Sequence, residues 1–447
     1  MKSTNSPNLA FAMKLLYTLF AFCSACSLAA QTPMTLRDCI ERAQQRNIKV
    51  RQAEINQKQQ ALQLDDARKA VLPEVNGSAG ENLSFGRGLT ANNTYETRNT
   101  NSTSLSVSAS MPLYTGGRLT HRRKQAALNL QAAGADARRL AEELQLQVAQ
   151  AYYQVLFRID LIAQAQTNLR NTLAQEERIG TQIRAGRLPE VDLAQAQART
   201  AQDRLALVQA ENDKMLALLE LSQLLEYTSP DSLKVTPPAV HTLPAAPGNP
   251  EEVYALSLTE RPALQAAQLR SQAADEQIEM ARAGMRPSLY LNAGLGTSYY
   301  NTSGVANAAF GRQLRDNLSQ NIGLSLAVPI FDRHSTRNSV ASAQLAAANA
   351  RLDEEELRKS LYKEIQNAYY AALTARHKWK AAQVADSAAV TAANLAQKKY
   401  EAGKGSFTDY DEARNKQTNA AVDRITAFYE ARYRQDVMDF YAGKPLQ

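Results

Sequence analysis

An internal repeat is the feature that most constrains the fold of this 447-residue chain. Three landmarks of one half recur in the other at one constant offset, the distance from Pro112 to Pro329. An offset held over roughly ninety residues indicates a duplicated structural unit, because both copies keep the same spacing. The paired segments are Met111-Pro112-Leu113-Tyr114 with Val328-Pro329-Ile330-Phe331, Ala151-Tyr152-Tyr153 with Ala368-Tyr369-Tyr370, and Ala185-Gly186 with Ala402-Gly403.

A proline-rich segment separates the two copies. Its density of proline suits neither helix interiors nor central strands. We therefore divide the chain into a first repeat at residues 31–229, an extended linker at 230–250 and a second repeat at 251–447. The prolines are Pro230, Pro237, Pro238, Pro244, Pro247 and Pro250.

Residues 1–30 have the pattern of a secretory signal peptide. The positive charge of Lys14 precedes an apolar run from Leu15 to Phe22, and small residues follow up to Ala30. Because the apolar run is too short to span a bilayer, we expect export of the chain and removal of this segment.

The three cysteines suggest neither a disulfide framework nor a catalytic thiol. Cys23 and Cys26 fall within the signal peptide, which leaves Cys39 alone in the mature chain. We expect Cys39 to be a small buried helix residue. For Cys26 we favour simple cleavage of the signal, and lipidation of this residue is the alternative.

Each repeat is predicted to hold two strands among helices of different length. The first repeat is expected to open with a helix from Thr35 to about Ala70. A helix without proline follows the strands from about 118 to 185, and another returns from about 190 to 227. The two shorter helices, placed end to end, match the long one at roughly 100 Å. Alanine and glutamine dominate the inner positions, which favours a thin helical wall over a solid core.

Four segments alternate apolar residues with small polar ones, as strands do. Leu105 and Val107, for example, alternate with Ser106 and Ser108. Such strands suit a membrane barrel, in which one face meets lipid and the other a wet lumen. The alternative is a soluble sheet whose apolar face covers a core. The strands are expected at about 74–86, 103–114, 288–299 and 320–331, with connecting loops at 86–103 and 300–320.

The number of strands has a consequence for assembly. Four strands cannot close a membrane barrel, since known barrels start at about eight. Open strand edges in lipid would leave backbone groups unpaired at a high cost in free energy. We therefore expect the chain to assemble with copies of itself.

The order of these elements and several short motifs resemble the TolC family of outer-membrane efflux proteins. The most specific pieces are the segment from Pro112 to Arg118 and the turn at Gly186 that is followed by Asp192. The resemblance covers nearly all of the mature chain, twice over. Ser84-Phe85-Gly86-Arg87-Gly88-Leu89 is similar to members from Bacteroidetes-type bacteria.

The resemblance implies a fold that is mainly α with membrane β, in which a twelve-stranded β-barrel is continuous with a twelve-helix α-barrel. It implies a homotrimer in the outer membrane of a Gram-negative bacterium, with a large periplasmic part and contact with outer-membrane lipid. The implied function is a passive exit duct of a tripartite efflux or type I secretion system. The implied partners are a periplasmic adaptor protein and an inner-membrane RND or ABC transporter.

The same resemblance implies a channel constriction formed by acids that follow the second turn glycine. In this chain they are Asp409 and Glu412, with Asp411 nearby. The first repeat has Asp192 and Gln195 at the corresponding positions, so the acidity is biased to the second repeat. Asp409 has a second interpretation, because a carboxylate is favourable at a helix start whether or not it lines a pore.

The sequence departs from the family pattern in two places. Gly405 stands where a basic residue often helps to latch the closed end of the channel. In the second repeat, Asp332-Arg333-His334 replaces the Thr115-Gly116-Gly117 junction between strand and helix.

The two glycine turns are expected to form the periplasmic tip, because a positive φ is often needed where helices reverse direction. We interpret the tip as the surface that contacts the adaptor. Cysteines at Arg187 or Lys404 should then crosslink to an adaptor, and cysteines at Asn92 or Asn307 should not. The tip residues, all expected to be exposed, are Gly186, Arg187, Leu188 and Pro189 in the first turn and Gly403, Lys404, Ser406 and Phe407 in the second.

No motif for catalysis, a cofactor or a bound metal stands out in the sequence. His121, His241, His334 and His377 lack ligand spacing, and we expect each to face solvent. The formal net charge is +7, but acids and bases alternate along the helices, so the clustered basic face of a nucleic-acid-binding protein is missing. We therefore expect a channel and not an enzyme. The alternative function is a periplasmic coiled-coil adaptor or scaffold, which would lack lipid-facing strands.

Overall fold

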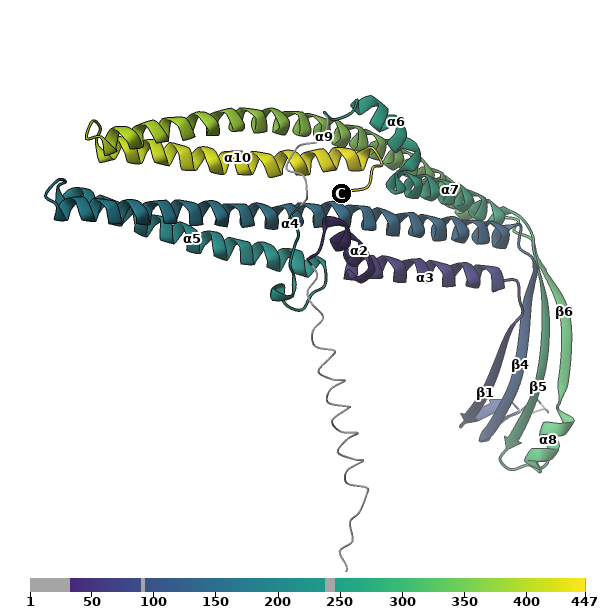
Figure 1. Cartoon of the computed structure of the whole chain (residues 1–447). Coiled ribbons are helices and arrows are strands. Elements are labelled where there is room, and N and C mark those ends of the chain that lie inside the picture. Colours follow the sequence, from purple (N-terminus) through teal and green to yellow (C-terminus); the bar gives the residue numbers. More distant parts are fainter. Residues whose placement is uncertain (1–32, 90–92, 238–245, 447) are drawn as a thin grey trace, which may run out of the picture. The chain divides into compact units, whose positions relative to one another are not determined.

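The computed structural model describes residues 33–89, 93–237 and 246–446 (Figure 1). The expected signal peptide and the middle of the linker lie outside the described residues, as do Asn92 and His241. The chain divides into two units. Of the described residues, the sheet unit comprises those within 52–140 and 258–362, and the helical unit comprises those before residue 52 and those within 141–257 and 363–446. In the described part of the chain, no helix combines the length and the hydropathy needed to cross a membrane.

Four antiparallel strands form the sheet, in the order β1-β4-β5-β6. Figure 1 shows them side by side in one curved layer. The central pair, β4 and β5, comes from different halves of the sequence, and β1 and β6 are the edge strands. Their bounds are β1 (Glu74–Ser84), β4 (Thr100–Tyr114), β5 (Ser288–Thr302) and β6 (Ser319–Ala327).

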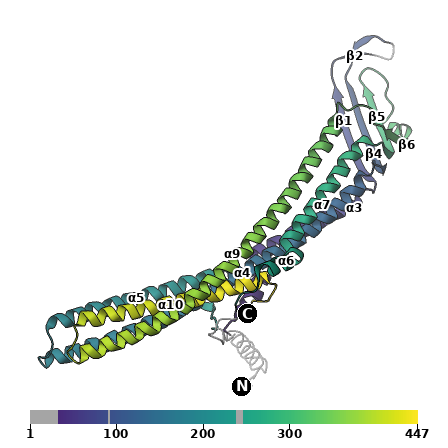
Figure 2. The same ribbon diagram turned by 90° about the horizontal axis from the view of Figure 1, so that it is seen from above.

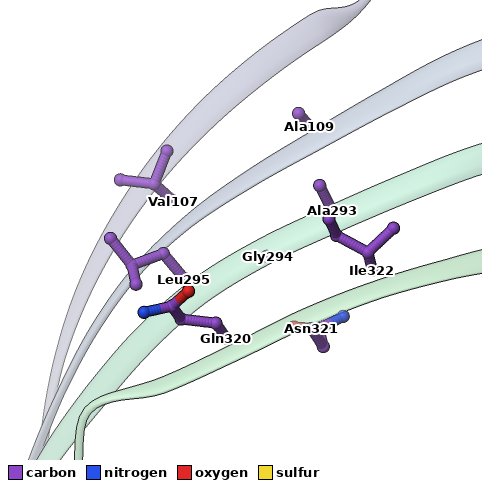
Figure 3. A pocket seen from close by; sticks show the side chains of 8 residues that line it. All are labelled: Val107, Ala109, Ala293, Gly294, Leu295, Gln320, Asn321 and Ile322. Atoms are coloured by element: carbon purple, nitrogen blue, oxygen red, sulfur yellow. The ribbon is translucent and has the colours of Figure 1, made fainter.

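The strand register collects apolar side chains on one face of the sheet. Val107 lies opposite Leu295, and Leu291 lies opposite both Met111 and Leu324. The serines, glycines and asparagines between them face the other side, because successive side chains of a strand alternate. The alternation in the sequence therefore produces a sheet with one apolar and one small polar face. Figure 3 shows part of the apolar face, a shallow hollow lined by Val107, Ala109, Ala293, Leu295 and Ile322 among others.

The connections between the strands hold short elements that the sequence pattern did not predict. Between β1 and β4, β2 (Arg87–Leu89) pairs with β3 (Tyr95–Thr97). Between β5 and β6 lies the short helix α8 (Phe310–Asp316). The expected strand to about residue 331 ends instead at Ala327, before Pro329, which has no N–H to donate to a strand ladder.

The opening helix of the first repeat is broken, so the expectation of one helix from Thr35 to about Ala70 is wrong. α2 (Leu36–Arg46) and α3 (Ile48–Lys69) meet at Asn47. The Asn47 side chain donates to the Leu224 carbonyl at 3.1 Å and accepts from the backbone N–H of Lys49 at 2.9 Å. These bonds compete with the helical ladder and end α2.

The opening helix of the second repeat is broken at the corresponding place. α6 (Pro250–Glu260) and α7 (Pro262–Arg282) meet at Arg261, whose ψ is 121°. Proline disfavours the helical conformation of the residue before it, so Pro262 causes this break. The spacing from Asn47 to Arg261 equals the spacing from Pro73 to Pro287.

The remaining helices have matching lengths in the two halves (Figure 2). α4 (Arg118–Arg184) and α9 (Ser335–Glu401) have 67 residues each, and α5 (Glu190–Leu224) and α10 (Phe407–Tyr441) have 35 each. The linker is not uniformly extended. Residues Pro230–Ser232 form a 3₁₀ helix, and Val235 forms a parallel bridge with Met34.

The core of the helical unit is formed around α2, α4, α5 and α10. Cys39 is fully buried in it, as expected for a small helix residue. Tyr153 is also buried, and its hydroxyl donates to Asp436 on α10. Burial disfavours the carboxylate and raises the pKa of Asp436 to about 6, although Arg432 and Tyr153 act in the opposite direction.

Candidate functional site

The candidate site is the pair of turns that join α4 to α5 and α9 to α10 in the helical unit. Gly186 and Gly403 have φ values of 71° and 69°, as expected from the sequence. In the first turn, Gly186 N–H donates to the Ile183 carbonyl and Arg187 N–H to the Gln182 carbonyl. The second turn repeats both bonds at the equivalent positions, from Gly403 and Lys404. Both helices therefore end in a Schellman motif, which requires the left-handed conformation at the glycine.

The helices that leave the two turns start differently. α5 follows Pro189, which makes no side-chain cap. α10 follows Ser406, which forms a capping box with Asp409: Asp409 N–H donates to the Ser406 hydroxyl at 3.0 Å, and Ser406 N–H donates to the Asp409 carboxylate at 3.2 Å. These bonds from Ser406 hold the pKa of Asp409 below its usual value. Asp409 thus has a local structural role at the start of α10.

The other two acids of the predicted constriction differ in exposure. Glu412 is exposed and lies three residues after Asp409, so the two share one side of α10. Asp411 is partly buried and accepts a hydrogen bond from Asn415 at 3.0 Å. Asp409 and Glu412 are therefore the pair available to a solvent-filled space.

The exposure predicted for the turn residues is wrong at Phe407. Its ring is 8% exposed and belongs to an apolar cluster with Tyr410 of α10, Ile179 of α4 and Ala196 of α5. Leu188 is half-buried against the same cluster. Phe407, the first residue of α10, therefore packs between the two hairpins and does not face solvent. The exposed turn residues are Gly186, Arg187, Pro189, Gly403, Lys404 and Ser406.

Two polar contacts join the α4–α5 and α9–α10 hairpins near the turns. The Tyr400 hydroxyl donates to the Asp192 carboxylate at 3.4 Å, and Arg178 lies 3.1 Å from Glu401. Burial and the neighbouring Asp192 carboxylate raise the pKa of Tyr400 to about 12. Asp192 stands out in the sequence by its distance from the turn glycine, but Tyr400 does not, because the two residues are far apart in the chain and only packing brings them together.

Comparison with known proteins gives the family. The family model described as "Outer membrane efflux protein" matches residues 39–226 and 253–437, which together form most of the chain. This chain belongs to the outer membrane efflux protein family. The resemblance inferred from the motifs is confirmed, as are the outer-membrane location and the mainly α fold with membrane β. The similarity of residues 84–89 to Bacteroidetes-type members stays a prediction.

The similar proteins include proteins named as outer membrane proteins and as outer membrane channels. The chain is 25% identical over 384 residues to Outer membrane protein TolC of Escherichia coli, a match that covers 82% of this chain and 73% of TolC. It is 28% identical over 314 residues to the pyoverdine export outer membrane protein OpmQ of Pseudomonas putida, covering 68% of this chain and 63% of OpmQ. The solved structure of the Campylobacter jejuni CmeC outer membrane channel shares the fold, with a TM-score of 0.77 at 20% identity over 92% of this chain and 86% of that one.

This outer membrane efflux protein also contains a buried charged network that sequence reasoning missed. Asp203 of α5 is 6% exposed, and its carboxylate accepts from the Thr172 hydroxyl at 3.1 Å. Arg199 and Arg414 lie 3.2 Å and 4.0 Å from the same carboxylate, and Arg414 donates to the Asn168 carbonyl at 2.8 Å. The network joins α4, α5 and α10 of the efflux protein by polar contacts.

One histidine of the efflux protein differs from expectation. His121 is partly buried, and its Nδ1 lies 2.6 Å from a carboxylate oxygen of Glu276. His334 and His377 are exposed, as predicted. Within the described ranges, histidines, cysteines and acids form no group that could hold a metal ion.

Proposed function

We propose that this protein is the passive exit channel of a tripartite efflux or type I secretion system and that it works as a homotrimer. The observation that carries the proposal is the sheet, with one apolar face and two open edges. The names of similar proteins support it, since CmeC is an outer membrane channel and OpmQ exports pyoverdine. A periplasmic coiled-coil adaptor or scaffold would be expected to lack a sheet with an exposed apolar face.

The apolar face of the sheet suits contact with lipid. Ile322, Leu324 and Leu326 of β6 are 82%, 66% and 64% exposed, which is unfavourable in water. β1 and β6 each present an unpaired edge, because the sheet ends at both strands. Unpaired backbone groups are not tolerated in hydrocarbon. Pairing of β1 in one copy with β6 in the next closes the sheet and leaves no edge.

The helices of the sheet unit carry a second signal for self-association. On α3, Ile55 and Leu62 are exposed and lie one heptad apart, and on α9 Leu345 and Leu352 have the same spacing. A heptad spacing of apolar residues is typical of a helix that packs against another helix along a seam. These stripes, like the sheet edges, are covered when copies of the chain assemble side by side.

We further propose that the protein is organised as the sequence divides it: an export signal at residues 1–30, repeats at 31–229 and 251–447, and the linker at 230–250. The two Schellman turns recur at the offset of Pro112 to Pro329, and the two helix breaks recur at the offset of Pro73 to Pro287, which supports this division. In each repeat a long rod would lie beside a two-piece rod in the wall of the channel.

The exposed turn residues are proposed as the contact with a periplasmic adaptor, which in turn links the channel to an RND or ABC transporter. We expect single cysteines at Arg187 or Lys404, both exposed, to crosslink to the adaptor in intact cells with a thiol-to-amine reagent. A cysteine at Asn307, in the loop before α8, should yield no adaptor crosslink and serves as the matched control. Crosslinks from position 307 alone, identified by mass spectrometry, would place the adaptor at the wrong end and reject the assignment.

Asp409 and Glu412 are proposed to line the narrowest part of the channel. In a trimer they place at least three pairs of carboxylates around one axis, and the resulting negative field attracts cations. We expect the double variant Asp409→Asn, Glu412→Gln to lose cation selectivity and block by trivalent cations in planar-bilayer recordings.

A variant of the capping box separates this role from helix capping. Ser406→Ala removes the bond to Asp409 N–H without changing any charge. It should reduce stability by about 1 kcal/mol and leave ion selectivity unchanged. If the charge variant keeps its selectivity in a folded trimer, these acids only stabilise the start of α10.

A further inference from the structure

The segment that contains α8 carries a feature that the channel function does not use. It lies between β5 and β6, in the loop that connects these strands away from the long helices (Figure 1). Three side-chain amides attach it to the edge of β5 beyond the point where β6 stops pairing, at Gly296 opposite Ser319. Asn307 and Gln313 each bond both the N–H and the carbonyl of one strand residue, Thr302 and Tyr300 respectively, and Asn317 donates to the Ser298 carbonyl.

These bonds fix α8 at a defined place. Ser298, Tyr300 and Thr302 are alternate residues, so their backbone groups point to the same edge of β5. Side-chain amides of the loop therefore bond the backbone groups of β5 that have no partner in β6. α8 is thus held to the sheet, and is not a freely moving part of the loop.

The contacts of α8 also show which face of the sheet it covers. The Phe310 ring lies 4.8 Å from the ring of Tyr299, and the Thr297 hydroxyl donates to the Leu314 carbonyl at 2.6 Å. Thr297 and Tyr299 alternate in phase with Leu295, so they belong to the apolar face. Leu318, just after α8, shares a hollow on this face with Leu105 and Leu295, among others. On the proposed function, this is the lipid-facing side of the sheet.

The opposite side of α8 is basic. Arg312 and Arg315 are exposed, and neither has an ion pair in the described part of the chain. At about 100° per residue, both lie across the helix from Phe310, Gln313 and Leu314, which contact the strand. Asp316, the single acid of α8, is exposed and pairs with neither arginine. Exposed Phe310 and Leu318 beside two free guanidinium groups form an amphipathic surface at the rim of the lipid-facing sheet.

We propose that this surface anchors the channel in the outer leaflet by binding the phosphate groups of an anionic membrane lipid through Arg312 and Arg315. Guanidinium groups match phosphate oxygens in a bidentate geometry, and an apolar helix side that enters the interface keeps them at the depth of the headgroups. The proposal rests on the proposed function, because it needs the apolar sheet face to contact lipid.

The test uses the full-length protein and lipid A, which carries two phosphates, as the probe. First, wild-type protein and the variant R312Q/R315Q are both expected to float with neutral phosphatidylcholine vesicles, which tests insertion alone. The protein is then inserted into phosphatidylcholine vesicles that also contain lipid A, and native mass spectrometry measures the lipid A retained by protein released from these vesicles. The variant should lose about fivefold in affinity for each arginine removed, and so about twenty-fivefold in total. Dephosphorylated lipid A should bind wild type and variant equally weakly.

The control is R46Q/R51Q, which removes the same charge from exposed positions on α2 and α3 and should not alter retention. Equal lipid A retention by wild type and R312Q/R315Q would overturn the inference while the proposed function stands. Displacement of lipid A by an equal concentration of inorganic phosphate would show a site for free anions and not for lipid. Failure of the wild-type protein to float would overturn the proposed function and this inference with it.

Discussion

We expect Asp203→Ala to lower the free energy of unfolding by about 3–5 kcal/mol. The Asp203 carboxylate is the one acid within 4.0 Å of both Arg199 and Arg414 among the described residues, and the Arg414 side chain is only 8% exposed. Its removal leaves two largely buried cations without a counter-ion, and the free energy of desolvation is then not offset by any pairing. Urea unfolding followed by circular dichroism measures the loss.

The matched control lies on the same helix. Asp213 of α5 pairs with Arg158 at 2.8 Å, but its side chain is 42% exposed. Exposed ion pairs contribute about 0–1 kcal/mol, so Asp213→Ala should shift the midpoint only slightly. Equal shifts for the two variants would mean that water reaches the Asp203 network and that it does not hold α4, α5 and α10 together.

The second large effect is expected at Gly116, where β4 passes into α4. Gly116 has a φ of 64°, and a Cβ atom there would lie 2.8 Å from both the Ala283 carbonyl oxygen and the Arg286 Cβ. Gly116→Ala should therefore lower the free energy of unfolding by roughly 2–4 kcal/mol, as the sum of left-handed backbone strain and a clash with backbone. The loss should appear as a lower melting temperature of the full-length protein.

Gly403→Ala provides the comparison, because its φ of 69° is similar and nothing lies within 4 Å of an added Cβ. Only the left-handed strain of about 1–2 kcal/mol remains there. If Gly116→Ala is no worse than Gly403→Ala, the close approach between the β4–α4 junction and the end of α7 is not a constraint on the fold.

The strands and their apolar face were predictable from sequence because they depend on a local period of two. Leu105 and Val107 alternate with serines, and this pattern alone fixes which face is apolar. The pairing of β4 with β5 was not predictable in the same way, since it joins residues from opposite halves of the chain. The extra pieces, β2, β3 and α8, follow from turn and amide bonding that has no periodic signature.

Of the two helix breaks, only one has a clear cause in the local sequence. The break at Arg261 can be predicted from the sequence, because Pro262 disfavours a helical conformation of the residue before it. The break at Asn47 cannot be predicted in this way, because its cause is a hydrogen bond to the carbonyl of Leu224, which is distant in the sequence. Asn47 and Arg261 are separated by the same number of residues as Pro73 and Pro287. Pro262 in the second repeat therefore also indicates a helix break near Asn47 in the first. A repeat therefore allows a feature that is clear in one copy to predict the same feature in the other.

The candidate site was predicted unevenly for a similar reason. The glycine turns were found because glycine at a helix end reports the backbone conformation directly. Phe407 was misplaced because its neighbours Ile179 and Ala196 belong to another hairpin. The partners of Asp192 and Asp203 are also set by packing between hairpins, and a single sequence gives no measure of such distances.

The central claim, that copies of this chain close one sheet in the outer membrane, is tested most directly by disulfide crosslinking between β1 and β6. One cysteine replaces Ser78 of β1, and a second replaces Asn321, Gly323 or Ser325 of β6, all on the small polar face. Cys39 is fully buried and does not interfere. Oxidised outer membranes should give covalent dimers and trimers for at least one of these pairs, no larger species, and no crosslink from either single variant. Monomers for every pair, or a ladder that continues beyond the trimer, would contradict the closed trimeric channel.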